Sequence, residues 1–299
     1  MNNPSPIVFF GSGPVAAASL ELLRQHQEVV AVVTKPTTQH EMELASGGAK
    51  VYSVSTKKEL DELISSGIFA NIRLAVLIDF GIIVSSLVIS SFELGIINSH
   101  FSVLPQLRGA DPISFAILSG QESTGVSLMM IEEGMDTGKV LTTRSLKIDV
   151  QDTTPSLTNK LIQLSDELLK EKIPLYTAGA IQPRNQSHPD RATYSRKLAK
   201  EDGIIDWEKP ASVIEREIRA FIEWPKSRTM IADKDVVITK AHASDDDTIG
   251  KPGDIVIFGK EAIGVTTASG ILWIDELKPA GKKEMPAKAF LAGYRQLLG

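Results

Sequence analysis

A strand, a glycine turn, a helix and a second strand follow one another within the first 34 residues, and this order restricts the fold more than any other feature of the chain. Residues 7–10 are continuously apolar and run into a Gly-Ser-Gly-Pro turn. Helical periodicity over residues 15–26 then leads to a second apolar run at residues 29–34. Connections of this kind are right-handed and join parallel strands, so the chain is expected to begin with an α/β unit.

The same alternation continues through the first part of the chain. Further helices and strands are expected where the apolar pattern changes its period, at residues 57–66, 74–79, 85–91, 96–100, 112–119, 124–131 and 140–148. An amphipathic helix over residues 155–173, with five leucines on one face, closes this part. We therefore predict a Rossmann-like, doubly wound α/β domain over residues 1–183.

The pattern changes after residue 183. Residues 184–210 are polar and aperiodic, which predicts a linker. Beyond it, a helix is expected over residues 211–220, followed by five short strands at residues 229–231, 236–238, 255–257, 262–266 and 271–274. Because short strands separated by turn residues are typical of small barrels, residues 211–299 are predicted to form an OB-like β-barrel domain.

The composition excludes several classes of protein. The 299 residues include no cysteine, which excludes disulfides, thiolate metal sites and a cysteine nucleophile. No apolar run reaches the ~18 residues of a membrane span, so we expect a soluble, cytoplasmic protein without a membrane partner. The net charge is -5 and the acidic excess lies in residues 1–183, so any contact with a nucleic acid is expected at a local patch of the second part.

The Gly-Ser-Gly-Pro turn also allows an alternative function, the binding of a dinucleotide. Glycines at a strand-to-helix turn let a pyrophosphate approach the helix N-terminus. Here Ala16 stands in place of a third glycine, and Thr34 and Lys35 stand where an acidic residue would contact a ribose. The pattern therefore favours a plain tight turn over a dinucleotide-dependent oxidoreductase.

Three polar residues are candidates for a catalytic site. Asn98 and His100 alternate along an apolar strand, so they point to one face at its carboxyl end, where open α/β sheets bind ligands. Asp136 lies in a glycine-flanked loop that is placed to reach the same end. Together these groups would supply an oxyanion donor, a general acid or base and a carboxylate that sets its charge state. From spacing alone, capping and loop roles are equally compatible with these residues.

Short motifs follow one another in a specific order along nearly the whole chain. Those of the first part are Asn98-Ser99-His100, Ser102-Val103-Leu104-Pro105, Arg108-Gly109-Ala110-Asp111-Pro112-Ile113 and Gly134-Met135-Asp136-Thr137-Gly138. Those of the second part include Ala192-Thr193-Tyr194, Ile205-Asp206-Trp207, Trp224-Pro225 and Pro252-Gly253-Asp254-Ile255. This ordered set resembles the methionyl-tRNA formyltransferase family of folate-dependent formyltransferases.

The resemblance implies an activity and a set of substrates. The formyl group of 10-formyl-tetrahydrofolate would be transferred to the α-amine of methionine esterified to initiator tRNA, for translation initiation, without a metal. Asn98, His100 and Asp136 would be the catalytic residues, and the folate would lie against Ser102, Val103, Leu104 and Pro105. A donor such as Asn98 or His100 would stabilise the charge that develops on the formyl oxygen by roughly 3 kcal/mol. Asp136 would favour the imidazolium form of His100 or hold a water that relays the proton.

One segment departs from the family pattern. The family has a long, basic, glycine-rich loop after its second strand, whereas residues 35–43 are shorter and carry two acidic side chains. This difference leaves two alternatives open: a formyltransferase of the same fold that acts on an amino-sugar nucleotide, and a catalytically silent RNA-binding relative. Contact with tRNA phosphates is instead expected in the second part, where Lys278, Lys282 and Lys283 are candidates. The protein is expected to be a monomer.

Overall fold

The computed structural model describes residues 5–246, 250–259 and 261–297. Within this part the chain forms two compact units. The first unit comprises the residues up to 112 together with residues 123–147 and 158–195. The second comprises residues 113–122 and 148–157 together with the chain from residue 196. Each unit has its own sheet, so the two are described in turn.

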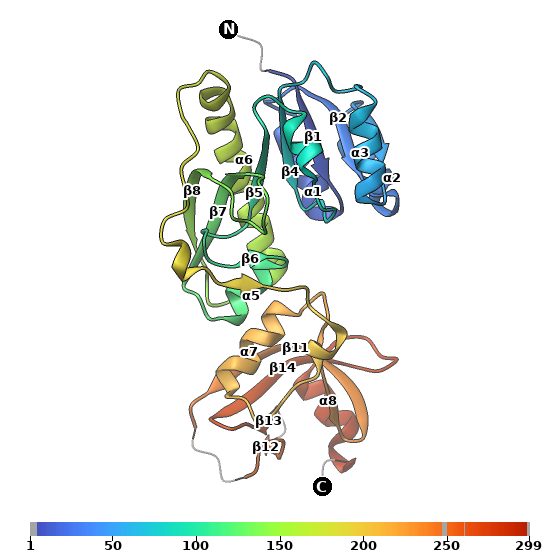
Figure 1. Ribbon diagram of the computed structural model, residues 1–299. Helices are drawn as coiled ribbons and strands as arrows, with labels where there is room; N and C mark the ends of the chain where they lie inside the picture. Colours follow the sequence, from blue (N-terminus) through green and yellow to red (C-terminus); the bar gives the residue numbers. More distant parts are fainter. Residues whose placement is uncertain (1–4, 247–249, 260, 298–299) are drawn as a thin grey trace. The chain divides into compact units, whose positions relative to one another are not determined.

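A seven-stranded sheet forms the centre of the first unit. Its strands are β1 (Ile7–Gly11), β2 (Val29–Thr34), β3 (Lys50–Ser53), β4 (Leu74–Ile78), β5 (Ile96–His100), β7 (Ser123–Met130) and β8 (Val140–Lys147). They lie in the order β3-β2-β1-β4-β5-β7-β8 (Figure 1). The first five are parallel, whereas β7 runs antiparallel to β5 and to β8. The α/β architecture is thus confirmed, and its antiparallel edge is an addition that the apolar pattern did not predict, since a buried strand has the same pattern in either direction.

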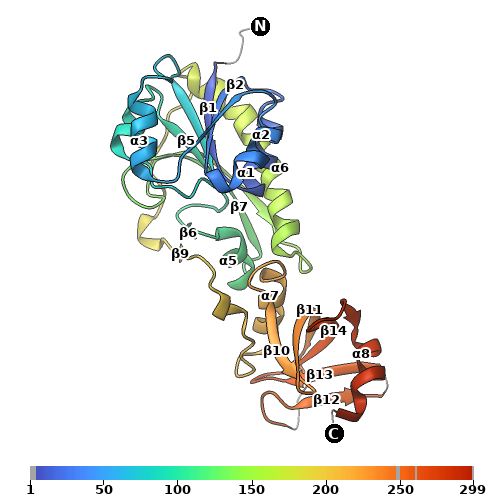
Figure 2. The ribbon, with the colours of Figure 1, turned by 90° about the vertical axis from the view of Figure 1, so that its right-hand side faces the viewer.

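Helices cover both faces of this sheet. They are α1 (Pro14–Leu23), α2 (Gln39–Ala45), α3 (Lys57–Ser65), α4 (Ser86–Ser90) and α6 (Thr154–Thr177). Residues of α3 and α4 share a buried cluster with Val8 and Phe10, whereas α1 and α6 lie on the opposite face (Figure 2). Helix α3 begins where Thr56 accepts a hydrogen bond from the Glu59 amide, which is an N-cap. No helix of the described chain is both long and apolar enough to traverse a lipid bilayer.

Helix α6 confirms the predicted amphipathic helix and extends it by about one turn at its C-terminal end. Its apolar face is formed by five leucines, each 8% exposed or less: Leu157, Leu161, Leu164, Leu168 and Leu169. Buried leucines at this spacing form one stripe of a helix against the sheet. A buried hydrogen bond of 2.6 Å between Ser165 and Ser99 also ties α6 to β5. The strand that ends in His100 is therefore held from the helix side as well as within the sheet.

An antiparallel six-stranded sheet forms the second unit. Its strands are β10 (Ser227–Ile231), β11 (Lys234–Ser244), β12 (Ile255–Phe258), β13 (Ala262–Thr266), β14 (Ile271–Pro279) and β15 (Met285–Pro286), in the order β10-β11-β14-β13-β12, with β15 beside β14. Its helices are α5 (Pro112–Leu118, grouped here from residue 113), α7 (Ala211–Ala220) and α8 (Ala287–Tyr294). Ile214 and Ile218 of α7 join Leu272 and Phe290 in the core. All five predicted strands and the predicted helix are present.

The segment 184–210, predicted as a linker, makes specific contacts within both units. Residues 184–195 group with the first unit and residues 196–210 with the second. In the first unit, β9 (Tyr194–Ser195) pairs in parallel with β6 (Arg108–Gly109). Arg184 also exchanges two backbone hydrogen bonds, of 2.7 and 2.9 Å, with Val140. In the second unit, Ile205 of this segment lies in the buried core and Trp207 packs against it, so the segment is ordered by specific contacts although its sequence is aperiodic.

Residues 148–157 group with the second unit because they bond to the end of α7. The Thr154 hydroxyl donates to the Ala220 carbonyl at 2.8 Å, and the Arg219 guanidinium donates to the Asp152 carbonyl at 2.8 Å. Arg219 also forms a bidentate pair with Glu215, one turn earlier on α7. The first contact satisfies the carbonyl of the last residue of α7, which has no intrahelical partner, and the second ties the chain before α6 to the same helix.

Candidate active site

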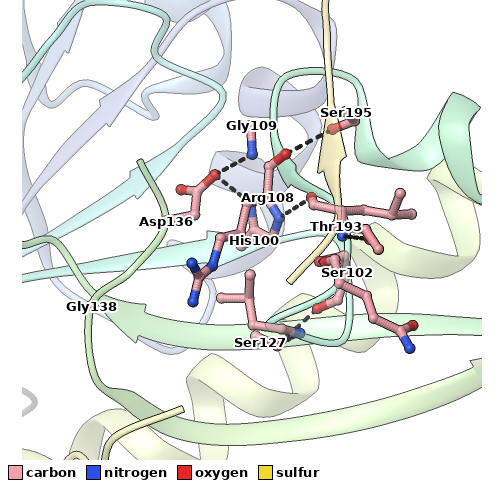
Figure 3. Close-up of polar contacts among 12 residues, drawn as sticks. His100, Ser102, Arg108, Gly109, Ser127, Asp136, Gly138, Thr193 and Ser195 are labelled. Atoms are coloured by element: carbon pink, nitrogen blue, oxygen red, sulfur yellow. Dashed lines mark hydrogen bonds and ion pairs between the residues drawn. The ribbon is translucent and has the colours of Figure 1, made fainter. Parts of the chain in front are cut away.

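A histidine and an aspartate meet at the carboxyl end of β5. His100 is the last residue of this strand, and Asp136 lies in the connection between β7 and β8. The Nδ1 atom of His100 lies 3.7 Å from Oδ2 of Asp136 (Figure 3). Both side chains are largely buried, at 7% and 16% exposure. The chain therefore brings together the two residues that sequence reasoning placed at one end of the sheet.

A backbone carbonyl fixes the orientation of the His100 ring. Nε2 of His100 lies 2.9 Å from the carbonyl oxygen of Leu107. Because a carbonyl can only accept, Nε2 must carry a proton and donate it. Leu107 has a φ of 53°, a left-handed conformation that is uncommon for a leucine. The ring is thus held with its other nitrogen, Nδ1, facing Asp136.

A backbone amide holds the Asp136 carboxylate. The Gly109 amide donates a 2.6 Å hydrogen bond to Oδ2, the same oxygen that faces His100 (Figure 3). A hydrogen bond to an ionised acceptor is stronger than one between neutral groups. Gly109 has a φ of +98°, and a Cβ atom there would lie 2.5 Å from the Ser195 carbonyl oxygen. Only glycine fits this position, and its amide is aimed at the carboxylate as a result.

The loop that carries Leu107 and Gly109 is held on its other side by residues 193–195. The Arg108 amide donates to the Thr193 carbonyl at 2.9 Å, and the Leu107 amide donates to the Thr193 hydroxyl at 2.9 Å. The Ser195 hydroxyl donates to the Arg108 carbonyl at 3.3 Å. The sequence analysis did not predict these supporting residues because they lie in the aperiodic segment. Thr193 does belong to one of the motifs that carry the family resemblance, and this was the available signal.

The residues predicted to line a folate form a tight turn directly after His100. The Ser102 hydroxyl, only 1% exposed, donates to the Gln106 carbonyl at 2.6 Å. From β7, the Ser127 hydroxyl donates to the Ser102 carbonyl at 2.8 Å and accepts from the Leu104 amide at 3.0 Å. Ser102 and Leu104 are therefore committed to the turn, while Val103 and Pro105 are the members that keep part of their surface exposed.

Asn98 lies two residues before His100 on β5 and is 8% exposed. Side chains two residues apart on a strand point to the same face, so its amide shares the face of the His100 ring. Within the described residues this amide has no hydrogen-bond partner, and its polar atoms are not completely enclosed by protein. It therefore keeps contact with solvent and is available to a ligand, although no direct contact joins it to His100 or Asp136.

Close packing at Gly11 and a positive φ at Gly13 account for the Gly-Ser-Gly-Pro turn. A Cβ atom at Gly11 would lie 2.9 Å from the Ile78 carbonyl oxygen, and Gly13 has a φ of +89°. The Ser12 hydroxyl lies 3.3 Å from the Thr34 hydroxyl and accepts a hydrogen bond from the Lys35 amide at 3.1 Å. The turn is thus tied to the end of β2. Over the described ranges, no three histidine or acidic side chains come together as a metal ion would require.

Comparison with known proteins identifies relatives over almost the whole chain. Two family models match, "Formyl transferase" over residues 6–173 and "Formyl transferase, C-terminal domain" over residues 197–295. The methionyl-tRNA formyltransferase of Citrifermentans bemidjiense is 35% identical over 97% of this chain and 93% of the relative. That of Roseiflexus castenholzii is 34% identical over 97% of this chain and 96% of the relative.

A solved structure has the same fold at lower sequence identity. It is the N-formyltransferase from Helicobacter canadensis in complex with folinic acid and dTDP-3-aminofucose. The TM-score is 0.68 at 19% identity, and the match covers 94% of this chain and 100% of the other. At this level of identity the likeness concerns the fold alone.

Proposed function

The chain belongs to the methionyl-tRNA formyltransferase family, and from this premise we propose that it transfers the formyl group of 10-formyl-tetrahydrofolate to the α-amine of methionyl initiator tRNA. The observation that carries the proposal is the His100–Asp136 pair, 3.7 Å apart at the carboxyl end of β5. Two buried groups that can exchange a proton, next to a free amide, suit an acyl transfer between nitrogen atoms.

The transfer forms one carbon–nitrogen bond and breaks another. The neutral α-amine attacks the formyl carbon, negative charge collects on the formyl oxygen, and the bond from that carbon to the folate nitrogen then breaks. The amine gives up a proton and the departing folate nitrogen takes one up, so the reaction needs no added oxidant or reductant. The protein has two tasks, to stabilise the oxyanion and to carry the proton.

Asn98, His100 and Asp136 divide these tasks in our proposal. Asn98 donates its unbonded amide to the formyl oxygen, because its side chain shares the face of His100 and remains accessible. In His100, the proton stays on Nε2, which donates a hydrogen bond to the Leu107 carbonyl, so Nδ1 is the atom that takes up and releases a proton. Asp136 accepts from Nδ1, either directly after a small closing movement or through one water, since 3.7 Å exceeds a hydrogen bond.

Residues 102–105 form the proposed folate contact. The turn is fixed by Ser102 and by Ser127, so its conformation does not depend on the ligand. Val103 and Pro105 offer partly exposed apolar surface beside His100. An apolar edge next to a few polar groups is typical of small-molecule sites.

The remaining parts of the proposal concern tRNA and the state of the protein. We assign catalysis to residues 1–183 and the phosphate contact to residues 211–299, with 184–210 between them. The exposed ammonium groups of Lys278, Lys282 and Lys283 lie on or directly after β14. Clustered, unburied lysines are the groups that displace counterions from a polyanion. We further propose that the protein is cytoplasmic and monomeric, and light scattering of the purified chain would test the monomeric state.

A labelled-formyl assay tests the function directly. Label from 10-formyl-tetrahydrofolate is followed into methionyl initiator tRNA, methionyl elongator tRNA and an amino-sugar nucleotide, each in a separate reaction. We expect transfer to the initiator tRNA alone. Transfer to the sugar nucleotide would move the activity to a formyltransferase of the same fold with another acceptor. Absence of transfer to all three, with tRNA binding retained, would favour a silent RNA-binding relative.

A further inference from the structure

Gln186 bridges the loop that carries Asp136. It is 8% exposed and lies in the aperiodic segment after α6. Its Nε2 atom donates to two backbone carbonyls, that of Asp136 at 2.7 Å and that of Gly138 at 3.0 Å. One side-chain amide therefore satisfies two carbonyls of one loop, 50 and 48 residues away along the chain.

The loop needs such support because its backbone conformation is unfavourable. Asp136 has a φ of 51°, which costs an aspartate free energy unless its surroundings hold it there. The Gly109 amide holds the carboxylate, but it does not bond to the backbone of the loop. Gln186 supplies the bonds to the backbone on either side of the bend.

Arg108 fixes which way the Gln186 amide faces. Its guanidinium, in a residue only 6% exposed, donates to Oε1 of Gln186 at 2.6 Å and to the Tyr194 hydroxyl at 3.4 Å. A guanidinium has donors only, so the amide oxygen must face it and the amide nitrogen must face the two carbonyls. The backbone of Arg108 leads directly into Gly109, whose amide binds Asp136. Asp136 is thus held at two points that Arg108 connects, its carboxylate by the Gly109 amide and its main-chain carbonyl by the Gln186 amide.

We propose that Gln186, oriented by Arg108, is a positioning residue that sets the distance between Asp136 and His100. This inference rests on the proposed function, in which Asp136 takes part in proton transfer. It adds to that function a residue of the segment 184–195 that affects the reaction rate without contacting the reacting atoms. A misplacement of about 1 Å is enough to slow a reaction by about a hundredfold.

Gln186→Glu isolates the two donor bonds. The variant keeps an oxygen for Arg108 but replaces Nε2 with an oxygen that repels the carbonyls of Asp136 and Gly138. We expect kcat to fall by about 10- to 100-fold while KM for folate and for tRNA changes less than about twofold. The exposed Gln163→Glu makes the same chemical change on α6 and serves as the control with unchanged activity. Wild-type kcat in Gln186→Glu would overturn the inference.

A double-mutant cycle with Asp136→Asn separates positioning from folding. If Gln186 acts through Asp136, Gln186→Glu costs less than about twofold in a chain that already lacks the carboxylate. The same 10- to 100-fold loss in both backgrounds would overturn the inference and indicate a merely structural role. Should Gln186→Glu not fold, as judged by circular dichroism, Gln186→Met removes the same donors at similar length and enters the same cycle. Wild-type activity of Asp136→Asn alone would instead contradict the proposed function.

Discussion

In the first unit the titratable side chains of the candidate site are buried and bonded to the backbone, whereas Arg196 and Asp202 of the second unit pair with each other nearer the surface. His100 and Asp136 are each held by one main-chain group, the Leu107 carbonyl and the Gly109 amide. By contrast, Arg196 and Asp202 form a bidentate pair in which the Arg196 side chain is 60% exposed.

The difference teaches which kind of contact suits which task. A backbone partner cannot rotate away, so it fixes a catalytic group to within a fraction of an ångström, which proton transfer requires. Exposed pairs contribute little to stability and exchange readily with other ions, which suits a surface that binds a polyanion. Four predictions test this comparison, in order of decreasing effect.

Removal of the buried titratable groups of the candidate site should have the largest effect. His100→Ala and Asp136→Asn are each expected to lower the single-turnover rate of formyl transfer by about 10²- to 10⁴-fold, the range of general acid–base catalysis. Circular dichroism should remain that of the wild type, because neither side chain contributes to the apolar core. Asp190→Asn, an exposed carboxylate outside the site, is the control. Wild-type rates in both variants would refute the assignment of the site.

The backbone partner of Asp136 should be nearly as sensitive. Gly109→Ala is expected to destabilise the protein by about 1–3 kcal/mol and to lower activity in the fraction that folds, because φ is +98° and Ser195 leaves no room. Gly179→Ala is the matched control, since its φ is +74° but open space surrounds it. Comparing the melting temperatures of the two variants separates the destabilisation caused by the steric clash from that caused by the positive φ alone. Equal melting temperatures would argue against a close fit at Gly109.

The exposed lysines should produce a smaller loss. Replacing Lys278, Lys282 and Lys283 together with alanine is expected to weaken tRNA binding by about tenfold near physiological salt. The slope of log K against log salt should become shallower by about 2, because fewer counterions are released. Lys57 and Lys58, exposed on α3, replaced in the same way, provide a comparison from the first unit. A slope equal to that of the wild type would remove the three lysines from the interface.

The exposed ion pair of the second unit should matter least. The hydrogen bond from Arg196, assisted by the Ala199 amide, lowers the pKa of Asp202 from 3.8 to about 2. A lowered folded-state pKa contributes stability that is present above pH 3.8 and is lost as the pH falls toward 2. Because the Arg196 side chain is 60% exposed, solvent screens the pair and the contribution amounts to no more than about 1 kcal/mol.

Asp202→Asn tests the prediction. Its free energy of unfolding should lie below that of the wild type from pH 5 to 8, and the two curves should converge as the pH falls from about 4 to about 2. Denaturant titrations at several pH values would measure the difference. A gap that stays constant down to pH 2 would show that the carboxylate charge is not the cause.

The sequence predicted the elements that pack a core better than the contacts that build the site. Helix α7 was placed at its observed bounds because Ile214 and Ile218 recur at helical spacing. The direction of β7 relative to β5 was not predicted because β7 is buried almost throughout and has the same apolar run in either direction, whereas the short connection from β7 to β8 is typical of antiparallel strands. The proximity of His100 and Asp136 was expected and is confirmed, whereas their catalytic roles remain predictions.

The supporting residues could not be predicted, for a physical reason. Gln186 reaches Asp136 across 50 residues, and Ser195 reaches Arg108 across 87. In each of these bonds a side chain donates to a main-chain carbonyl. Because every residue has such a carbonyl, the sequence does not indicate which residue will be the acceptor. Periodicity detects burial of apolar faces, and none of these residues covers such a face.

The parallel pairing of β6 with β9 also determines when during synthesis the site can form. A ribosome that has released only the first 183 residues has produced His100 and Asp136 but not Gln186, Thr193 or Ser195. The nascent chain then contains both side chains of the candidate site without the segment that holds their loops in place. A fragment cut at residue 183 would keep this unfinished state permanently, whereas a cut after Ser195 would release a chain that contains every contact described around His100.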